Sequence, residues 1–407
     1  MRMRTLLLPV TILSLLAGLV FPAAASAGRA PYRTAFVEWR GGDGGFAGWQ
    51  RAGVILGADG SLVLDPSTAS SETDPYPPGG YYGHDFYNGG SYLVGEAVSP
   101  ETRTAFGFRE AIASWNASTP AGTWVETQIR ARLGNRWTKF YNLGVWAADG
   151  STVERHSVNL QGDGDGFVAV DTLILTAKKV SARAFQLKLR LFTEDPNAVS
   201  SVRTAAVAIS TSAVRPDGLV PGDPALWSRV LPVPECSQMV YPDGGEVWCS
   251  PTSTSMVLAY WENDSGPCEP RVRAAVEGVF DWLYDGHGNW PFNTAYAATH
   301  GLEGVVARFT SMADAEEWIA AGVPVVISYA WKKNELTGAP IRSSDGHLAV
   351  LAGFDAVGNP IVNDPAAPSD DSVQRTYLRE ELESLWLEHS GGTAYLIYPP
   401  GWPVPAP

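Results

Sequence analysis

The sequence predicts two domains of different fold classes, an all-β domain followed by an α+β domain. Up to about residue 214, apolar and polar residues alternate with the period of two that is typical of half-buried strands. After about residue 232, apolar residues recur at helical spacing before strand-like runs return. A Pro- and Gly-rich stretch, 215–231, separates the two patterns and indicates a linker. A length of 407 residues allows each domain its own core.

The first residues predict an exported protein. Arg2 and Arg4 precede an uncharged apolar run from Leu6 to Val20, and Ala25–Ala27 form a small-residue cleavage site. Residues 1–27 therefore predict a signal peptide; an uncleaved membrane anchor is the alternative, but the run is short for a full span. No later segment is apolar for long enough to cross a bilayer. We expect a secreted, extracellular protein without a membrane span.

The charge of the chain excludes some classes of partner. The net charge is −14, and it becomes −16 when the two signal-peptide arginines are removed. An acidic surface disfavours nucleic acid, and no cluster of Lys and Arg interleaves with aromatic residues as a nucleic-acid groove requires. We therefore expect no nucleic-acid partner. The oligomeric state is not predicted.

Residues 28–214 are expected to form a β-sandwich or jelly roll. Five alternating segments are separated by turn-forming pairs such as Asp149-Gly150 and Asn88-Gly89. These segments are Gly53–Leu56, Trp124–Leu133, Thr138–Ala147, Phe167–Leu175 and Ala184–Phe192. Exposed aromatic residues here would allow sugar stacking and a substrate-binding role, but burial in the core is favoured. The acidic, Gly-rich run 161–166 lacks the downstream Glu of a calcium loop and is interpreted as a turn.

Residues 232–407 predict helices first and an antiparallel sheet afterwards, which is an α+β order. The expected helices are Ser250–Trp261, Arg271–Tyr284, Ala313–Ala321 and Leu378–His389. The expected strands are Val323–Ala330, His347–Phe354, Asn359–Asn363 and Ala394–Tyr398.

The three cysteines, Cys236, Cys249 and Cys268, all lie in the second domain. Paired thiols tend to oxidise outside the cytosol, and an odd number leaves one cysteine free. We expect a disulfide between Cys236 and Cys268, with Cys249 free. The alternative is that Cys249 is paired and another cysteine is buried.

Cys249 is the candidate nucleophile. It precedes Ser250, a good N-cap residue, and Pro251, which suits the first helical turn, so Cys249 is expected at a helix N-terminus. The partial positive charge there favours thiolate over thiol, and a thiolate is what acyl transfer needs. The alternative is a small buried hydrophobic residue ahead of a helix.

His347 is the candidate general base, because it lies at the start of an apolar strand. The next strand ends at Asn363 and Asp364, and a hairpin would bring either side chain close enough to fix the imidazole tautomer. The alternative for His347 is a structural, hydrogen-bonded histidine. Gln238 precedes Cys249 and offers an amide as oxyanion donor.

His287 is the rival base, in a Gly-rich loop with Asn289 and Trp290. We favour a structural or substrate-binding role for it, with Trp248, Asn289 and Trp290 as further residues of a candidate substrate cleft. The histidines lack metal-ligand spacing, so neither a metal nor another cofactor is expected.

Together these residues resemble the bacteriocin-processing-type papain-like cysteine peptidases, and more closely the stand-alone secreted actinobacterial peptidase-like members of that group. The resemblance covers about Pro232 to Pro399 and rests on Gln238, Trp248-Cys249-Ser250-Pro251-Thr252-Ser253, Gly346-His347 and Asn363-Asp364-Pro365. It implies a papain-like fold, with Cys249 as nucleophile, His347 as base, Asp364 as its orienting partner and Gln238 as oxyanion donor. The family has Gly where this chain has Ser250, and Tyr241–Gly245 lengthen the spacing between Gln238 and Cys249.

Three functions are consistent with these residues. The first is a secreted cysteine peptidase acting on extracellular peptides or proteins. The second is another acyl-transfer enzyme, such as a peptidoglycan amide hydrolase or a transglutaminase-like enzyme, with a cell-wall substrate. The third is a catalytically inactive binding protein with the same fold.

Overall fold

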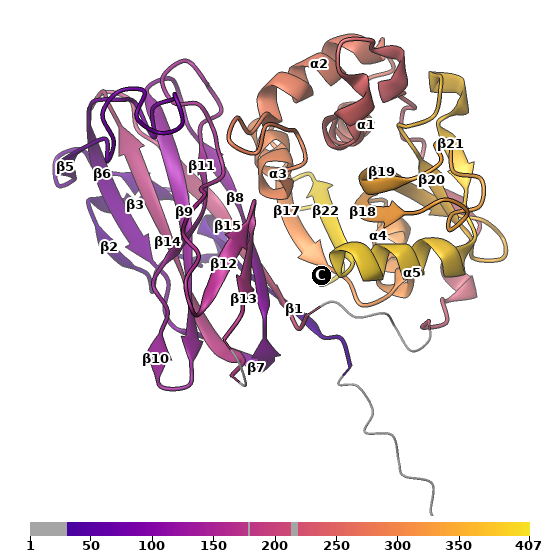
Figure 1. Ribbon diagram of the computed structural model, residues 1–407, viewed down its shortest axis with the longest axis horizontal. Coiled ribbons are helices and arrows are strands. Elements are labelled where there is room, and N and C mark those ends of the chain that lie inside the picture. Colours follow the sequence, from indigo (N-terminus) through magenta and orange to yellow (C-terminus); the bar gives the residue numbers. More distant parts are fainter. Residues whose placement is uncertain (1–30, 178–179, 213–218) are drawn as a thin grey trace, which may run out of the picture. The chain divides into compact units, whose positions relative to one another are not determined.

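The computed structural model describes residues 31–177, 180–212 and 219–407 (Figure 1). Residues 32–407 form one compact unit. The expected signal peptide, residues 1–27, and the first residues of the expected linker, 215–218, lie outside the described residues. No helix in the described ranges is both long and apolar enough to cross a membrane.

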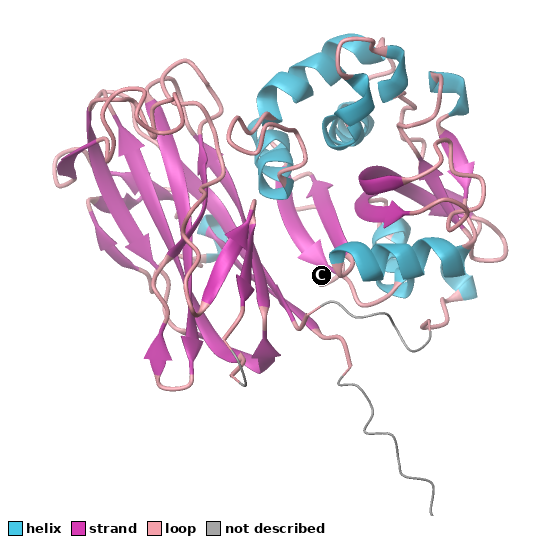
Figure 2. Cartoon of the chain, in the orientation of Figure 1, coloured by secondary structure: helices cyan, strands magenta, loops and turns pink. Residues whose placement is uncertain are grey.

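The N-terminal domain consists of two antiparallel sheets that face each other (Figure 2). The first sheet has the order β12 (Gly166–Ala169), β13 (Thr172–Leu175), β8 (Glu110–Ser118), β15 (Ser201–Ser210), β4 (Leu62–Leu64), β3 (Val54–Leu56), with β1 (Thr34–Arg40) also paired to β15. The second has the order β10 (Arg136–Trp137), β9 (Thr123–Leu133), β14 (Ala182–Thr193), β6 (Ser91–Val98), β2 (Gln50–Ala52), and β11 (Tyr141–Trp146), β7 (Thr102–Phe108) and β5 (Ser70–Thr73) join it at β9, β14 and β6. A short 3-10 helix, η1 (Gly41–Asp43), follows β1.

Apolar side chains from both sheets fill one core, which includes Trp115 of β8 and Ile129 of β9. Along β9 the buried Ile129, Ala131 and Leu133 alternate with the more exposed Gln128, Arg130 and Arg132, so the period-two prediction for this segment is confirmed. Several aromatic residues of this domain are core residues, among them Trp49, Trp115, Tyr81 and Tyr87. Tyr82, in contrast, is exposed.

The segment expected to be one strand, Phe167–Leu175, is a hairpin of β12 and β13. The chain reverses at Val170 and Asp171, and Val170 has a φ of 58°. A left-handed conformation is rare for a β-branched residue, so the alternating pattern alone does not reveal this turn. The hairpin matters for function because its turn reaches the cleft described below.

The C-terminal domain packs its helices around a single antiparallel sheet, above and below its strands in the view of Figure 2. The sheet has the order β17 (Glu303–Arg308), β22 (Thr393–Tyr398), β18 (Val325–Trp331), β19 (Ser344–Phe354), β20 (Pro360–Asn363), β21 (Gln374–Thr376), with β16 (Arg229–Val230) paired to β19. The helices are α1 (Cys249–Glu262), α2 (Cys268–Val279), α3 (Trp290–Thr299), α4 (Met312–Ala320) and α5 (Arg379–Ser390). Short 3-10 helices are η2 (Pro224–Leu226), η3 (Gln238–Val240), η4 (Gly245–Val247) and η5 (Asp370–Ser372).

Four expected helices are present, but α2 starts at Cys268 and ends at Val279, earlier than the Arg271–Tyr284 expected. Helix α3 was not expected. The Asn289 side chain caps it by accepting from the N–H of Phe292, and Pro291 lies in its first turn. Seven of its ten residues are buried, so no single apolar stripe marks it in the sequence.

The end of the expected linker is part of the C-terminal sheet. Arg229 and Val230 of β16 pair with Phe354 and Gly353 of β19. A Cβ at Gly353 would lie 2.2 Å from the carbonyl oxygen of Arg229, so the close pairing requires glycine at this position. This short strand packs as part of the sheet because Gly353 lets the two backbones approach.

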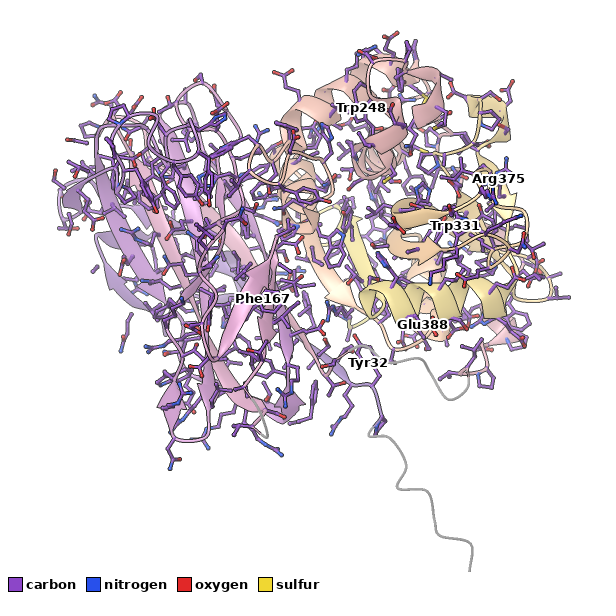
Figure 3. The ribbon with its side chains drawn as sticks, viewed as in Figure 1. Tyr32, Phe167, Trp248, Trp331, Arg375 and Glu388 are labelled. Carbon is purple, nitrogen blue, oxygen red and sulfur yellow. A yellow bond between two sulfur atoms is a disulfide. The ribbon has the colours of Figure 1, made fainter. Side chains whose placement is uncertain are left out.

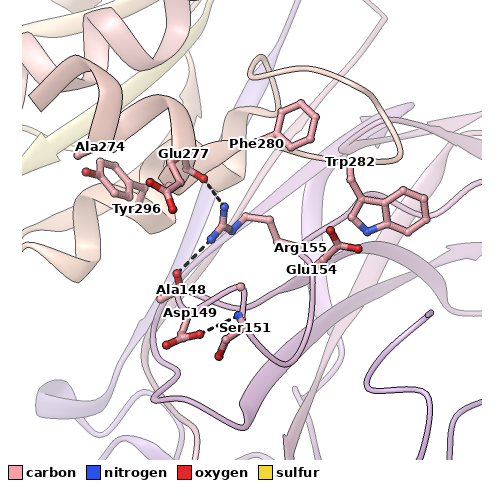
Figure 4. A pocket seen from close by; sticks show the side chains of 12 residues that line it. Ala148, Asp149, Ser151, Glu154, Arg155, Ala274, Glu277, Phe280, Trp282 and Tyr296 are labelled. Carbon is pink, nitrogen blue, oxygen red and sulfur yellow. Dashed lines mark hydrogen bonds between the residues drawn. The ribbon is translucent and has the colours of Figure 1, made fainter. Parts of the chain in front are cut away.

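Polar contacts join the two domains within the compact unit. The Asn116 side chain of β8 donates to the carbonyl of Gly304 at 2.6 Å and accepts from its N–H at 3.1 Å. Arg308 of β17 forms an ion pair with Glu110 of β8 at 2.5 Å. Arg155 donates to the carbonyl of Glu277, at 2.7 Å, beside a second cavity of ≈ 720 Å³ (Figure 4). These polar contacts accompany an apolar one, because Phe292 and Ala295 of α3 pack within the core of the N-terminal domain.

Candidate active site

Cys249 is the first residue of α1, as expected, so its backbone N–H belongs to the turn that lacks intrahelical acceptors. Ser250 does not cap the helix, contrary to expectation: the N-cap position is Trp248, with no side-chain cap. The Ser250 hydroxyl instead lies 2.9 Å from the hydroxyl of Tyr395 on β22. The helix starts two residues earlier than a Ser250 cap requires, and Ser250 anchors its first turn to the sheet.

His347 lies on β19, opposite Tyr329 of β18. The rings of Tyr329 and Trp331 contact its imidazole edge to face, with centroids 5.5 and 5.4 Å away, and fix its orientation. The Ser253 hydroxyl of α1 donates to the carbonyl of Leu348 at 3.1 Å. This bond holds the first turns of α1 against the start of β19, and so brings Cys249 and His347 together.

Asp364, and not Asn363, is the side chain that meets His347. The predicted hairpin is present, because β19 and β20 pair with Val350 opposite Asn363. His347 Nε2 lies 2.8 Å from Asp364 Oδ1. The Asn363 amide points elsewhere and donates to the carbonyl of Val233 at 3.0 Å.

The Asp364 carboxylate is fully buried and accepts hydrogen bonds at both oxygens. Besides His347, Oδ1 accepts from the N–H of Ala366 at 2.9 Å. Oδ2 accepts from the hydroxyls of Tyr377, at 2.6 Å, and Tyr329, at 3.1 Å. A buried carboxylate with four donors is held in one position and keeps its charge.

The three groups shift one another's pKa. Burial raises the pKa of Cys249, but the hydrogen bond and charge of His347, with backbone N–H groups of the helix start and β19, bring it below its usual value. Burial lowers the pKa of His347, but the charge and hydrogen bond of Asp364 raise it well above its usual value. The pKa of Asp364 is lowered, since His347 outweighs burial. These shifts favour a thiolate beside an imidazolium.

Gln238 lies on η3 and is buried. Its Nε2 donates to the carbonyl of Gly245 at 2.7 Å, which leaves the second amide hydrogen for another acceptor. The additional residues 241–245 fold back beneath it: a Cβ at Gly245 would lie 2.0 Å from the Gln238 carbonyl oxygen. The lengthened spacing is thus taken up by a compact turn, and Gln238 still lines the same cavity as Cys249.

Cys236 and Cys268 form a disulfide, and Cys249 is free and partly exposed. The first of the two pairing alternatives is therefore present. The disulfide joins the segment just before Gln238 to the first residue of α2.

Cys249, His347 and Gln238 line a cleft of ≈ 1230 Å³. Of the residues predicted for the cleft, Trp248, His287 and Trp290 line it. Asn289 does not: it is fully buried, where it caps α3 and donates to Asp281 at 2.9 Å. Figure 3 shows Trp248 beside α1 and Trp331 on the opposite, sheet side of the domain.

His287 lines the cleft but does not meet Asp364. Its ring packs against Phe280 and Trp248, with centroids 5.1 and 6.3 Å away. Burial lowers its pKa to about 4, so it is neutral at neutral pH. The structural or substrate-binding role that the sequence favours for His287 stays a prediction.

The sequence missed the contribution of the N-terminal domain to the cleft. Asp171 and Thr172, from the β12–β13 hairpin, and Glu110 of β8 line it together with Arg308 of β17. Asp171 is nearly buried and accepts from the N–H of Trp290, at 2.8 Å, at the start of α3. No motif marks Asp171, because its place depends on how the two domains pack.

Comparisons with known proteins match each half of the chain to a protein family. Residues 35–210 match the family model described as "Peptidase C39 N-terminal domain", and residues 230–394 match that described as "Peptidase_C39 like family". The second match begins within β16 and includes Gln238, Cys249, His347 and Asp364. A search of curated proteins gave no match.

Solved structures gave matches of low identity. They include a xylan-binding module CBM15, with 13% identity over 44% of this chain and 100% of that one (TM-score 0.22). They also include a family two carbohydrate esterase from Cellvibrio japonicus, with 12% identity over 56% of this chain and 50% of that one (TM-score 0.18). At these TM-scores neither likeness bears on fold or function. The two family matches do, and the chain belongs to the C39-type papain-like peptidase family, through residues 230–394 and the N-terminal domain that accompanies them.

Proposed function

We propose that this protein is a secreted cysteine peptidase in which Cys249 is the nucleophile. The observation that carries the proposal is the chain of contacts Cys249–His347–Asp364 in one cleft, with the pKa of the thiol lowered and that of the imidazole raised. A thiolate paired with an imidazolium is the reactive form of such enzymes. The family match supports a peptidase-like hydrolase.

The reaction begins with attack of Cys249 Sγ on the substrate carbonyl carbon. The oxyanion of the tetrahedral intermediate accepts from the free amide hydrogen of Gln238 and the N–H of Cys249. His347 then gives its Nδ1 proton to the leaving amine, and the C–N bond breaks to leave an acyl-thioester on Cys249. Water, deprotonated by His347, attacks the thioester and releases the acid and the thiol. Asp364 orients the ring throughout and stays ionised.

The N-terminal domain is proposed to help bind the substrate, since its β12–β13 hairpin lines the same cleft as Cys249. Secretion, with removal of residues 1–27, is proposed from the signal-like sequence and is compatible with the disulfide.

The test is a comparison of the mature protein, from residue 28, with its Cys249→Ala variant. A peptide library with mass-spectrometric readout should show new termini with the wild type and none with the variant. Equal hydrolysis by both proteins would refute the assignment. If purified cell-wall muropeptides are cleaved or joined and library peptides are not, the same nucleophile serves a peptidoglycan amide hydrolase or a transferase instead.

A reactive-thiol probe separates an inactive binding protein from an enzyme. Iodoacetamide should modify Cys249 at neutral pH much faster than an ordinary thiol, because its pKa is lowered. An ordinary thiol reactivity, together with no hydrolysis, would support the binding-protein alternative.

A further inference from the structure

The rim of the active-site cleft carries carboxylates without cationic partners. Glu246 of η4, Asp285 in the loop after α2 and Asp345 near the start of β19 are all exposed and all line the cleft. Within the described residues, none of the three forms an ion pair with Lys or Arg. They come from three separate segments of the chain, so their negative charge is distributed over the lining of the cleft.

The positive charge in the cleft does not offset them. Of the described residues that line it, Arg308 is the sole Lys or Arg, and Glu110 already neutralises it in an ion pair at 2.5 Å. The histidines next to two of the carboxylates are neutral at neutral pH. Desolvation lowers the pKa of His287, beside Asp285, to about 4 and also lowers the pKa of His389, beside Asp345.

Two other acidic side chains of the cleft already have partners within the protein. Asp243 forms an ion pair with Arg273 at 2.7 Å. Asp171 is nearly buried and accepts from the N–H of Trp290. The unsatisfied negative charge is therefore concentrated at Glu246, Asp285 and Asp345, where a substrate enters.

Exposed apolar side chains line the same cleft as these carboxylates. Met239, Val247 and Tyr284 line the cleft and are 41%, 60% and 48% exposed, although large apolar side chains are usually buried. Trp248, one residue before the nucleophile, is buried and lines the same cleft. The lining of the cleft thus combines apolar side chains with negative charge. Its volume of ≈ 1230 Å³ exceeds the roughly 300–1,000 Å³ of an ordinary small-molecule pocket, which favours an extended chain as ligand.

We propose that the substrate is a polypeptide segment in which basic side chains flank apolar ones, with Glu246, Asp285 and Asp345 binding the basic side chains. This inference rests on the proposed function, because it assigns the substrate of the same cleft. The recognised chemistry is an ammonium or guanidinium group beside an apolar side chain. Acidic or neutral polar segments gain nothing from the rim.

The size of the preference follows from the exposure of the carboxylates. An exposed ion pair changes an equilibrium by about one- to fivefold, so three of them together are expected to give about a tenfold effect at low salt. Salt screens such pairs, with a Debye length of about 8 Å at physiological ionic strength, so the preference should shrink at 0.5 M salt.

The experiment measures binding and hydrolysis separately. Two fluorescent peptides with the same apolar centre, one flanked by Lys and the other by Glu, are titrated onto the Cys249→Ala protein. The triple variant Glu246→Gln/Asp285→Asn/Asp345→Asn is compared with Glu380→Gln, an exposed carboxylate on α5 that lines neither cavity. The Lys peptide should bind about tenfold more tightly than the Glu peptide. The triple variant should lose this preference, and Glu380→Gln should keep it.

The outcomes separate the two proposals. Equal binding of both peptides, or a preference that survives in the triple variant, overturns the basic-substrate inference whether or not the enzyme is active. A general attraction of the acidic protein for cations would make Glu380→Gln lose about one third of what the triple variant loses, since it removes one charge instead of three, and that result also overturns it. With Cys249 restored, loss of all hydrolysis alongside intact Lys-peptide binding would instead contradict the peptidase function.

Discussion

The carboxylate of Asp364 lies 2.8 Å from Nε2 of His347, which leaves Nδ1 as the ring nitrogen that serves Cys249. Because an ionised carboxylate only accepts, Nε2 carries a proton in this pair. Two tyrosine hydroxyls, from Tyr329 and Tyr377, hold the other carboxylate oxygen. The tautomer of the imidazole is therefore set by a buried network and does not depend on the substrate.

Replacing Asp364 by Asn should lower kcat/KM by roughly 10²- to 10⁴-fold, because the imidazolium loses its buried counter-ion and the tautomer is no longer fixed. Tyr377→Phe is the matched control: it removes one neutral hydrogen bond from the same carboxylate but keeps the charge, so the loss should be less than about tenfold. Steady-state kinetics on both variants measure this. Equal losses would mean that the charge of Asp364 is unimportant.

The charge of His347 should affect how the alkylation rate of Cys249 depends on pH. In the wild type, His347 lowers the pKa of the thiol, so the rate of iodoacetamide alkylation should rise at a pH below the usual thiol range. In His347→Gln, burial remains and the lowering charge is lost, so the midpoint should move upward. Hydrolysis should fall again at alkaline pH as His347, whose pKa is raised, loses its proton. An unchanged alkylation midpoint in the variant would contradict the pairing.

Gln238→Ala should reduce kcat by about 10²-fold with little change in KM, because the amide acts on the oxyanion of the intermediate and not on the bound substrate. The rate of Cys249 alkylation should stay at the wild-type value, since Gln238 is not among the groups that shift the pKa of the thiol. A parallel loss of alkylation would instead mean that the variant disturbs the start of α1.

The disulfide should stabilise the C-terminal domain by constraining its unfolded state. Cys236 and Cys268 are 32 residues apart, for which chain entropy gives about 3–4 kcal/mol. Cys236→Ser should lower the Tm by several degrees. Reductant should lower the Tm of the wild type to a similar value and leave that of the variant unchanged. If reductant destabilises both proteins equally, the disulfide is not the cause.

Asp171→Asn should stabilise the protein at neutral pH. Burial raises the pKa of Asp171 to about 6, so the folded state binds more protons than the unfolded state between about pH 4 and 6. Stability therefore falls as the pH rises through this range, and the ionised group costs on the order of 1–3 kcal/mol at pH 7. Thermal unfolding should show a higher Tm for the variant at pH 7 and no difference below pH 4. An equal difference at both pH values would point to packing instead.

Much of the site followed from local sequence. Cys249 and His347 each stand at the start of an element whose periodicity is strong, and the short connection after β19 predicts a hairpin with the strand that ends at Asn363 and Asp364. The choice between Asp364 and Asn363 did not follow, because it depends on which side chain the pleat turns toward His347.

The missed features depend on contacts far apart in the sequence. Helix α3 is buried on nearly all sides between the two domains, so it lacks the apolar stripe that periodicity detects. The turn at Val170 interrupts an apolar run without Gly, Asn or Pro to mark it. Asp171 gains its environment from Trp290, which lies 119 residues later in the chain.

The pairing of β16 with β19 determines where this polypeptide tolerates being cut. A fragment that starts at residue 232 would lack Arg229 and Val230, and Gly353 and Phe354 would then be paired on one side only, with β20. Gly353 has no side chain to shield that edge, so the shortened fragment should associate through it with other strands. Dissection of the two domains should therefore cut before Pro224, so that β16 stays with the sheet it completes.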